Sequence, residues 1–206
     1  MLLLDHIRNS SIYQLLRGVH NSNEGNLLEI TDSQTAEAQI ELIRYAHTLY
    51  SIKDILEIGF NKGMFSLLIS HINSHVAGGD VYILGIDVNP LANEAAKILN
   101  RSTPLSIDFQ CEDSTTLVPK LNSNRSFDLA WVDGNHEYSY ALQDLKNVSA
   151  LGVPIILLDD TNMHTVQQAY QDWLNITPTY TELTNPFLAY DSRKARLFIN
   201  RNTFVV

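Results

Sequence analysis

The protein has 206 residues, of which 45% are hydrophobic and 18% charged, so we expect a folded domain with an ample core. Its 14 Lys and Arg residues against 23 Asp and Glu residues give a net charge of −9, which argues against binding to nucleic acid or to an anionic membrane. The single cysteine, Cys111, excludes an intrachain disulfide and a cysteine-based zinc site. No apolar stretch reaches the roughly 18 residues of a membrane span, and Leu2–Leu4 is too short for a signal peptide, so we expect a cytoplasmic protein.

The first fifty residues are predicted to be helical. Apolar residues recur at helical spacing between Ser33 and Tyr50, and more weakly between Leu3 and Leu16. We expect residues 1–50 to form a helical extension that belongs to the same domain as residues 51–206.

From residue 54 onward, short apolar strands alternate with helical patterns. Strands are predicted at 54–58, 81–86, 105–111, 127–132 and 153–158, with helices at 65–72, 91–100, 138–148 and 165–174. Segments 179–183 and 195–200 are joined too closely for a crossover helix, which predicts an antiparallel hairpin. The pattern is typical of an α/β protein with a doubly wound, seven-stranded, mostly parallel sheet and N-terminal helices.

Histidines are scattered, and only His71 and His75 are spaced four residues apart on a predicted helix. They lie near the end of that helix, away from the strand ends, so we expect them to be surface residues rather than metal ligands.

In a sheet of this kind, ligands bind outside the carboxyl ends of the strands. The first strand leads into a turn in which Gly59 allows a tight bend and Gly63 would let the backbone approach a ligand. Asn61 replaces the middle glycine of the dinucleotide fingerprint, which disfavours a nicotinamide-dependent oxidoreductase. A purely structural turn is the alternative.

Polar residues also follow the second and third strands. Asp87 ends the second strand, where a carboxylate can accept both hydroxyls of a ribose; its alternative role is to cap the next helix. Asp113 and Ser114 follow the third strand, from which an adenine edge can be read, and either could instead be a helix cap.

The densest polar cluster follows the fourth and fifth strands, as Asp133-Gly134-Asn135-His136-Glu137-Tyr138 and Asp159-Asp160. These strands should be neighbours, so the three aspartates should converge and repel one another unless a cation neutralises them. Oxygen ligands suit Mg²⁺, Mn²⁺ or Ca²⁺. In the alternative, Asp133 and Asp159 bind backbone amides and Asp160 is solvated.

The chain resembles class I S-adenosylmethionine-dependent methyltransferases over roughly residues 33–200. The resemblance is carried by EIGFNKGMFS, Asp87, FDLAWVDGNHEYSYALQDL and IILLDD. The D-G-x-H-x-Y and D-D motifs are similar to those of macrocin-type sugar O-methyltransferases and, more distantly, of catechol-type enzymes. The resemblance implies a Rossmann-like methyltransferase fold for residues 51–206.

The resemblance also implies roles for individual residues. Asp133, Asp159 and Asp160 match metal-binding positions. In the relatives, an aspartate that acts as the catalytic base stands where this chain has Asn135. His136 therefore becomes the candidate base, beside a catalytic Asp133. A histidine at this position can equally be structural. The implied cofactor-binding residues are Glu57, Gly59, Phe60, Asn61 and Gly63 for the methionine end, Asp87 for the ribose, and Asp113 and Ser114 for the adenine.

The sequence therefore predicts an S-adenosylmethionine-dependent O-methyltransferase, assisted by a divalent cation and acting on a small-molecule hydroxyl. A homodimer is compatible with it. Two alternatives stay open, a non-catalytic S-adenosylmethionine-binding protein and, less favoured, a nicotinamide-dependent oxidoreductase.

Overall fold

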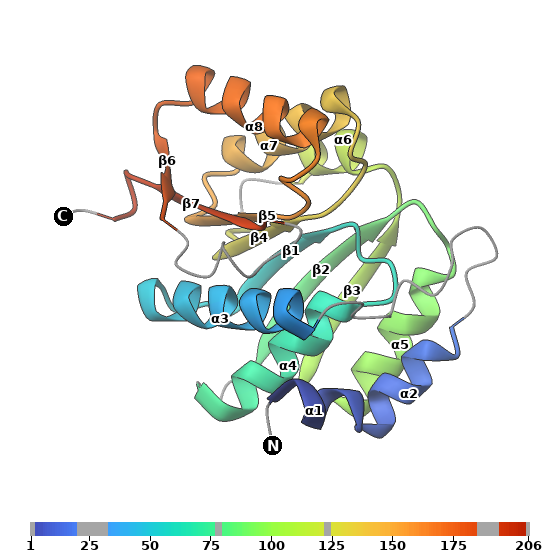
Figure 1. Ribbon diagram of the computed structural model, residues 1–206. Helices are drawn as coiled ribbons and strands as arrows, with labels where there is room; N and C mark the ends of the chain where they lie inside the picture. The colour runs from blue at the N-terminus through green and yellow to red at the C-terminus, as the bar shows by residue number, and fades with distance from the viewer. Residues whose placement is uncertain (1–2, 20–32, 77–79, 122–124, 185–193, 205–206) are drawn as a thin grey trace.

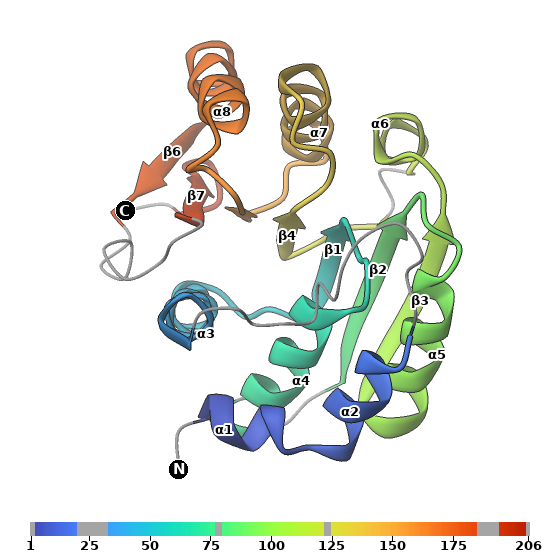
Figure 2. The same cartoon turned by 45° about the vertical axis from the view of Figure 1, so that its right-hand side comes forward.

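The computed structural model describes residues 3–19, 33–76, 80–121, 125–184 and 194–204, and its centre is a seven-stranded sheet covered by helices on both faces (Figures 1 and 2). The strand order is β3-β2-β1-β4-β5-β7-β6. Six strands run in the same direction, and β7 is antiparallel to both of its neighbours, β5 and β6. The strands are β1 (Asp54–Ile58), β2 (Val81–Asp87), β3 (Leu105–Cys111), β4 (Leu129–Val132), β5 (Ile155–Leu158), β6 (Tyr180–Leu183) and β7 (Arg196–Asn200). The predicted fold class, including the terminal hairpin, is confirmed.

Two helical layers flank this sheet, as Figure 2 shows with α7 and α8 on one side and α3, α4 and α5 on the other. The first layer contains α3 (Ser33–Leu49), α4 (Met64–Val76) and α5 (Ala92–Ser102), with α1 (Leu3–Arg8) and α2 (Ser11–Arg17) packed outside it. The second contains α6 (Ser114–Leu117), the short 3₁₀ helix η1 (Val118–Lys120), α7 (Tyr138–Ala150) and α8 (His164–Ile176). Among the described residues, no helix is both long and apolar enough to span a bilayer.

Successive side chains of the central strands point alternately to the two faces of the sheet, and each face packs against one helical layer. In β5, Ile155 and Leu157 join the core under α3 and α4, whereas Ile156 and Leu158 join the core under α7 and α8. All four residues are at most 2% exposed. A strand covered on both faces needs apolar residues at every position, which is why this run could be recognised from the sequence.

The N-terminal segment differs from its prediction. The expected single helix from Leu3 to Leu16 is two helices, because Ser10 has extended backbone angles and its hydroxyl accepts a hydrogen bond from the Tyr13 amide at 3.2 Å. A serine cap of this kind starts a new helix. Both helices contribute to the main core, through Ile7 in α1 and Leu16 in α2.

The expectation of a surface His71 is wrong. Its exposed fraction is 9%, and its Nδ1 lies 3.0 Å from the Leu67 carbonyl oxygen, one turn earlier in α4. Helix α4 lies between the sheet and the N-terminal helices, so it is buried on more than one side. The side chain of His75 lies outside the described residues.

At the outer edge of the sheet, β3 has no strand beyond it in the described chain. The side chain of Asn100 in α5 satisfies both outward backbone groups of Ile107: Nδ2 donates to the carbonyl oxygen at 2.8 Å, and Oδ1 accepts from the amide at 2.7 Å. The hydroxyl of Thr103 accepts a further bond from the Leu105 amide at 3.3 Å.

Candidate active site

The carboxyl ends of β1 and β4 form the centre of the candidate site. The chain moves outward from β1 to β2 and β3 on one side, and from β4 to β5 on the other. The strand order reverses between β1 and β4, and open α/β sheets bind their ligands outside the strand ends at such a reversal.

The β1–α4 turn is shaped by a close approach of two backbones. Gly59 has a φ of 82°, and a Cβ atom there would lie 1.8 Å from the carbonyl oxygen of Asp133 in the β4–α7 turn. No side chain fits in that space. The sequence predicted a glycine for the tight bend, and the structure adds that this glycine is required by the neighbouring turn.

Gly63 and Phe60 both have packing roles in this turn. Gly63 has a φ of 70°, and a Cβ atom there would meet the Leu99 side chain at 2.5 Å, so packing alone requires a glycine; its approach to a ligand stays a prediction. Phe60 is 1% exposed, and its ring packs beside Gly85 and Phe109. Its side chain is therefore part of the core beneath the turn.

Asp87 joins two turns at this rim. Its Oδ2 accepts a hydrogen bond from the Asn61 amide at 2.6 Å, and its Oδ1 accepts one from the Asn89 amide at 2.8 Å. It does not cap α5, whose N-cap residue is Leu91. Each carboxylate oxygen has a second lone pair, so Asp87 can still accept hydroxyl groups from a ligand.

Glu57 is buried beneath the same turn, with an exposed fraction of 1%. Its Oε2 accepts a short hydrogen bond from the hydroxyl of Ser66 in α4. Burial raises the pKa of Glu57 to about 8; the Ser66 hydrogen bond opposes this shift, and the negative charges of Asp133 and Asp87 add to it. The side chain is therefore mostly protonated at neutral pH.

Asp113 and Ser114 begin the short helix α6. Asp113 Oδ1 accepts hydrogen bonds from the amide and the hydroxyl of Thr115, both within 2.8 Å, so the capping role considered from the sequence is present. The Ser114 hydroxyl donates to Asp144 Oδ1 at 2.7 Å. Burial raises the pKa of Asp144 to about 6; the bond from Ser114 lowers it and the charge of Asp113 raises it.

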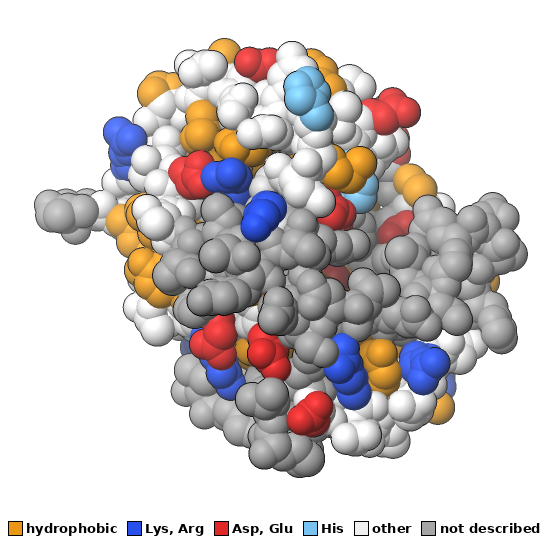
Figure 3. Space-filling view, viewed as in Figure 1, with side chains coloured by type: hydrophobic (Ala, Val, Ile, Leu, Met, Phe, Trp, Pro, Cys, Tyr) orange, Lys and Arg blue, Asp and Glu red, His pale blue; other side chains and the backbone are white. Residues whose placement is uncertain are grey.

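Asp133, His136 and Asp160 meet at the carboxyl ends of β4 and β5. His136 Nε2 lies 3.4 Å from Asp133 Oδ1 and 3.2 Å from Asp160 Oδ2, and the potential ligand atoms of all three residues lie within 4.8 Å of one another. Figure 3 shows acidic and histidine side chains gathered beside a recess on this face. Two carboxylates and an imidazole at such separations fit the donor set of one divalent cation.

Asp160 adopts an uncommon backbone conformation for a residue with a side chain, with a φ of 52°. The residue that follows it, Thr161, is 3% exposed, and its hydroxyl hydrogen-bonds to the Lys194 carbonyl oxygen and accepts from Arg196 Nε at 3.2 Å. Strand β7 thus holds the β5–α8 turn in place, and this contact supports the left-handed conformation of Asp160.

Asp159, the third predicted metal ligand, is not part of this group. It is 2% exposed, and Gln39 Nε2 in α3 lies 3.2 Å from each of its carboxylate oxygens. Its carboxylate therefore connects the N-terminal helical layer to the end of β5.

Asn135 forms a local turn. Its Oδ1 accepts a hydrogen bond from the Glu137 amide at 2.9 Å, immediately before α7. An asparagine that bonds to the backbone two residues later is a common turn-forming arrangement, and an amide cannot take up a proton.

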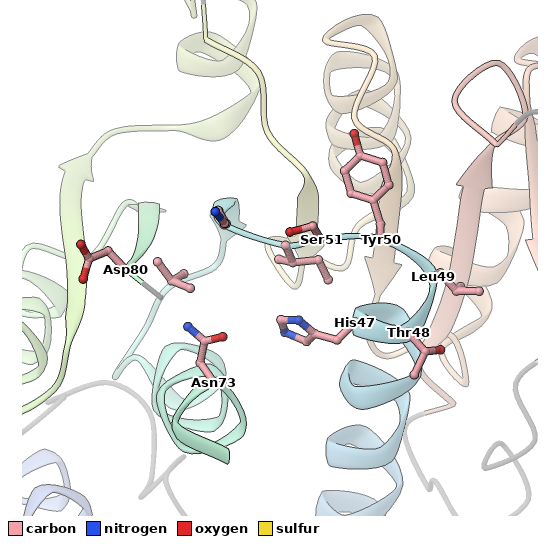
Figure 4. A pocket seen from close by; sticks show the side chains of 10 residues that line it. His47, Thr48, Leu49, Tyr50, Ser51, Asn73 and Asp80 are labelled. Atoms are coloured by element: carbon pink, nitrogen blue, oxygen red, sulfur yellow. The ribbon is translucent and has the colours of Figure 1, made fainter. Parts of the chain in front are cut away.

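A separate cavity of about 400 Å³ lies at the opposite, amino edge of the sheet, between α3, α4 and the start of β1 and β2. In Figure 4 the ring of His47 and the amide of Asn73 point toward each other across it. Burial lowers the pKa of His47, and its Nε2 has no hydrogen-bond partner among the described residues. This cavity is remote from the strand ends that carry the clustered acids.

The sequence analysis did not identify Asp144 and Gln39 as residues of the site. Asp144 could have been recognised, because it falls on the buried face of α7 between Ala141 and Leu145. An acid on an apolar stripe needs a partner. Gln39 carried no such signal, since its contact with Asp159 joins residues 120 positions apart.

The strand order, with one antiparallel strand inserted beside β5, is that of the class I methyltransferase fold. A sequence family described as "Methyltransferase domain" matches residues 56–161, just over half of the chain. The chain belongs to this family. No curated protein matches it.

Solved structures share the fold at low sequence identity. The N-methyltransferase NodS from Bradyrhizobium japonicum WM9, solved with S-adenosyl-L-homocysteine, superposes with a TM-score of 0.58 at 18% identity and covers 93% of this chain and 99% of its own. The Podospora anserina methyltransferase PaMTH1, also bound to S-adenosyl-L-homocysteine, gives 0.59 at 16%, covering 96% and 93%. CalS11, a TDP-rhamnose 3′-O-methyltransferase of calicheamicin biosynthesis, gives 0.57 at 14%, covering 92% of each chain.

Replacing Gly59 should test the contact between the two turns. Gly59→Ala would place a Cβ atom against the Asp133 backbone, so we expect it to lower the free energy of unfolding by at least about 3 kcal/mol. Gly152→Ala is a matched control, because Gly152 has a φ of 73° and a Cβ atom added there would meet nothing within 4 Å, so this change should cost only about 1–2 kcal/mol. Urea denaturation measures the free energy of unfolding of both variants. An equal loss in the two would contradict the close contact between Gly59 and the Asp133 backbone.

The raised pKa of Glu57 predicts a specific pH dependence of stability. Between its ordinary pKa of 4.5 and about 8, the folded state holds a proton that the unfolded state has released, so stability falls as pH rises through this window and is constant above it. Glu57→Gln removes this loss. In chelator-treated protein, the variant should gain on the order of 3 kcal/mol more at about pH 8 than at about pH 5, measured by urea denaturation. The same gain at both pH values would mean that Glu57 is not protonated.

Proposed function

We propose that this protein transfers the methyl group of S-adenosylmethionine to a hydroxyl of a small molecule, with the assistance of a divalent cation. The observation that carries the proposal is the group formed by Asp133, His136 and Asp160 at the rim of a methyltransferase fold. These side chains lie beside the β1–α4 turn, where the resemblance places the methionine end of the cofactor.

The charge of the β1–α4 turn and its neighbours favours this cofactor. S-adenosylmethionine carries a positive sulfonium and a positive ammonium group, and Asp87 and Asp133 bring carboxylates to the turn that would receive it, while the protonated Glu57 beneath adds no charge at neutral pH. Asp87 would accept the ribose hydroxyls, while Asp113 and Ser114 would face the adenine. NodS and PaMTH1, which share the fold, were solved with S-adenosyl-L-homocysteine.

The residues at the carboxylate rim fit a divalent cation. Asp133 and Asp160 supply oxygen atoms and His136 supplies Nε2; an imidazole ligand favours Mn²⁺ over Mg²⁺. Bound there, the ion would supply a Lewis acid that lowers the pKa of the acceptor hydroxyl. Asp159, held by Gln39, would support the end of β5 from behind.

The chain's own contribution is to align the reactants. The acceptor oxygen forms a new bond to the methyl carbon while the carbon–sulfur bond breaks, which leaves S-adenosylhomocysteine, and the hydroxyl proton is released to solvent. Holding oxygen, methyl and sulfur in line supplies much of the rate increase. CalS11, which shares the fold, is an O-methyltransferase. Sugar methyltransferases of the type that this chain resembles use an aspartate base, and this chain has Asn135 at that position.

Calorimetry with S-adenosylmethionine, followed by transfer of its labelled methyl group to a panel of phenols, catechols and sugars, tests the proposed activity. We expect binding, and transfer that requires Mn²⁺ or Mg²⁺ and stops on chelation. Binding without transfer to any acceptor would favour the non-catalytic alternative.

The cation can be tested without turnover. In chelator-treated protein, Mn²⁺ at a hundredfold excess over its Kd should raise Tm by about 5 °C or more. Asp160→Asn should remove most of this rise, because it takes away one of the two charged ligands. Asp108→Asn, at an exposed aspartate in β3, should retain it. A full rise in Asp160→Asn would place the ion elsewhere.

His136 has two candidate roles that one variant separates. As a ligand, His136→Ala should weaken Mn²⁺ binding and lower turnover at least about tenfold, with cofactor affinity nearly unchanged. Unchanged Mn²⁺ affinity with the same loss of turnover would assign it instead as the base. His164→Ala, at an exposed histidine, is the control, and Asn135→Asp should preserve or raise turnover. Near-normal turnover in His136→Ala would contradict both roles.

A further inference from the structure

Asp144 is a buried acid that the proposed mechanism does not use. It lies in α7 with an exposed fraction of 1%. Its Oδ1 accepts the hydroxyl proton of Ser114, and its Oδ2 lies 3.2 Å from the position that a Cβ atom on Gly134 would occupy. The carboxyl group therefore sits between the turn after β3, where the resemblance places the adenine, and the turn after β4.

This contact fixes the polarity of the Ser114 hydroxyl. A hydroxyl has one proton to donate, and here that proton is directed to Asp144 at 2.7 Å. Toward a ligand, the half-buried Ser114 oxygen then presents only lone pairs. The neighbouring Asp113 also offers only acceptor atoms when ionised, and its Oδ1 already serves Thr115.

A set of acceptors at this position discriminates between purines. The 6-amino group of adenine donates hydrogen bonds, whereas the 6-oxo group of hypoxanthine accepts them. An acceptor that faces another acceptor leaves both without a hydrogen bond, and such mismatches are strongly rejected in buried sites.

We propose that Asp144 is a positioning residue that holds Ser114 as a hydrogen-bond acceptor and thereby selects a 6-aminopurine over a 6-oxopurine cofactor. The inference rests on the proposed function, which places the adenine of S-adenosylmethionine beside Ser114. Asp144 acts through Ser114 and does not touch the cofactor.

The raised pKa of Asp144, about 6, sets the condition for a test. At about pH 8 the carboxylate is ionised and can only accept the Ser114 proton. Asparagine at this position can present its amide NH₂ to the Ser114 oxygen, which frees the hydroxyl proton to turn toward the ligand.

Calorimetry at about pH 8 with S-adenosyl-L-homocysteine and its deaminated counterpart, S-inosyl-L-homocysteine, measures the selectivity. The wild-type protein should prefer the adenine compound by about tenfold or more, and Asp144→Asn should reduce this preference at least about threefold, with Asp113 still present as an acceptor. Ser114→Ala, which removes the Ser114 acceptor, should reduce the preference by a similar factor, and Asp144→Asn combined with Ser114→Ala should lose no more than either alone.

Asn147→Ala is the matched control. Asn147 lies three residues further along α7, is 8% exposed and also bonds to α6, through Nδ2 to the Thr115 carbonyl oxygen at 3.3 Å. Its loss should change the affinity for both compounds by the same factor and leave the preference intact.

The outcomes separate this inference from the proposed function. Tight binding of S-adenosyl-L-homocysteine with a preference that survives both Asp144→Asn and Ser114→Ala would overturn the role of Asp144 and leave the proposed function standing. Failure of the wild-type protein to bind either compound would overturn both. If Asp144→Asn does not fold, Ser114→Ala alone decides the result.

Discussion

The contact between Gly59 and the Asp133 carbonyl is the constraint on which the rest of the site depends. Two crossover connections leave neighbouring parallel strands, and their turns approach until no side chain fits between them. That approach brings Glu57 beneath the turn, Asp87 beside it and the Asp133 carboxylate across from it, although the three residues come from three different strand ends. A glycine that looks like a ligand-binding signature is thus first a condition for bringing the two turns together.

Crowded acids are the electrostatic result of this packing. Glu57 is kept protonated by burial and by its acidic neighbours, and Asp144 has a raised pKa on the other side of the β4–α7 turn. A fold that optimised only its own stability would place apolar residues at such positions. Their presence here accompanies two oriented serine hydroxyl groups: Ser66 in α4 donates to Glu57, and Ser114 at the start of α6 donates to Asp144.

The sequence predicted the sheet well because its strands are covered on both faces, so that runs such as Ile155–Leu158 are apolar throughout. It predicted which strand ends carry polar residues, because carboxyl ends of parallel strands share one edge. It did not predict side-chain pairing across that edge: Gln39 hydrogen-bonds to Asp159, and His136 groups with Asp133 and Asp160. Local periodicity also missed the break at Ser10, where the serine side chain caps a new helix, and the burial of His71, which depends on what packs against α4.

The pairing of Asn100 with the backbone of Ile107 has a consequence for assembly. A strand at the margin of a parallel sheet is an open template for another chain. One amide side chain, reaching from α5, occupies both the donor and the acceptor that an incoming strand would need at Ile107. A second molecule would have to break both of these bonds in order to pair with β3 at this position, and it would also meet the exposed acidic side chain of Asp108 in the same strand.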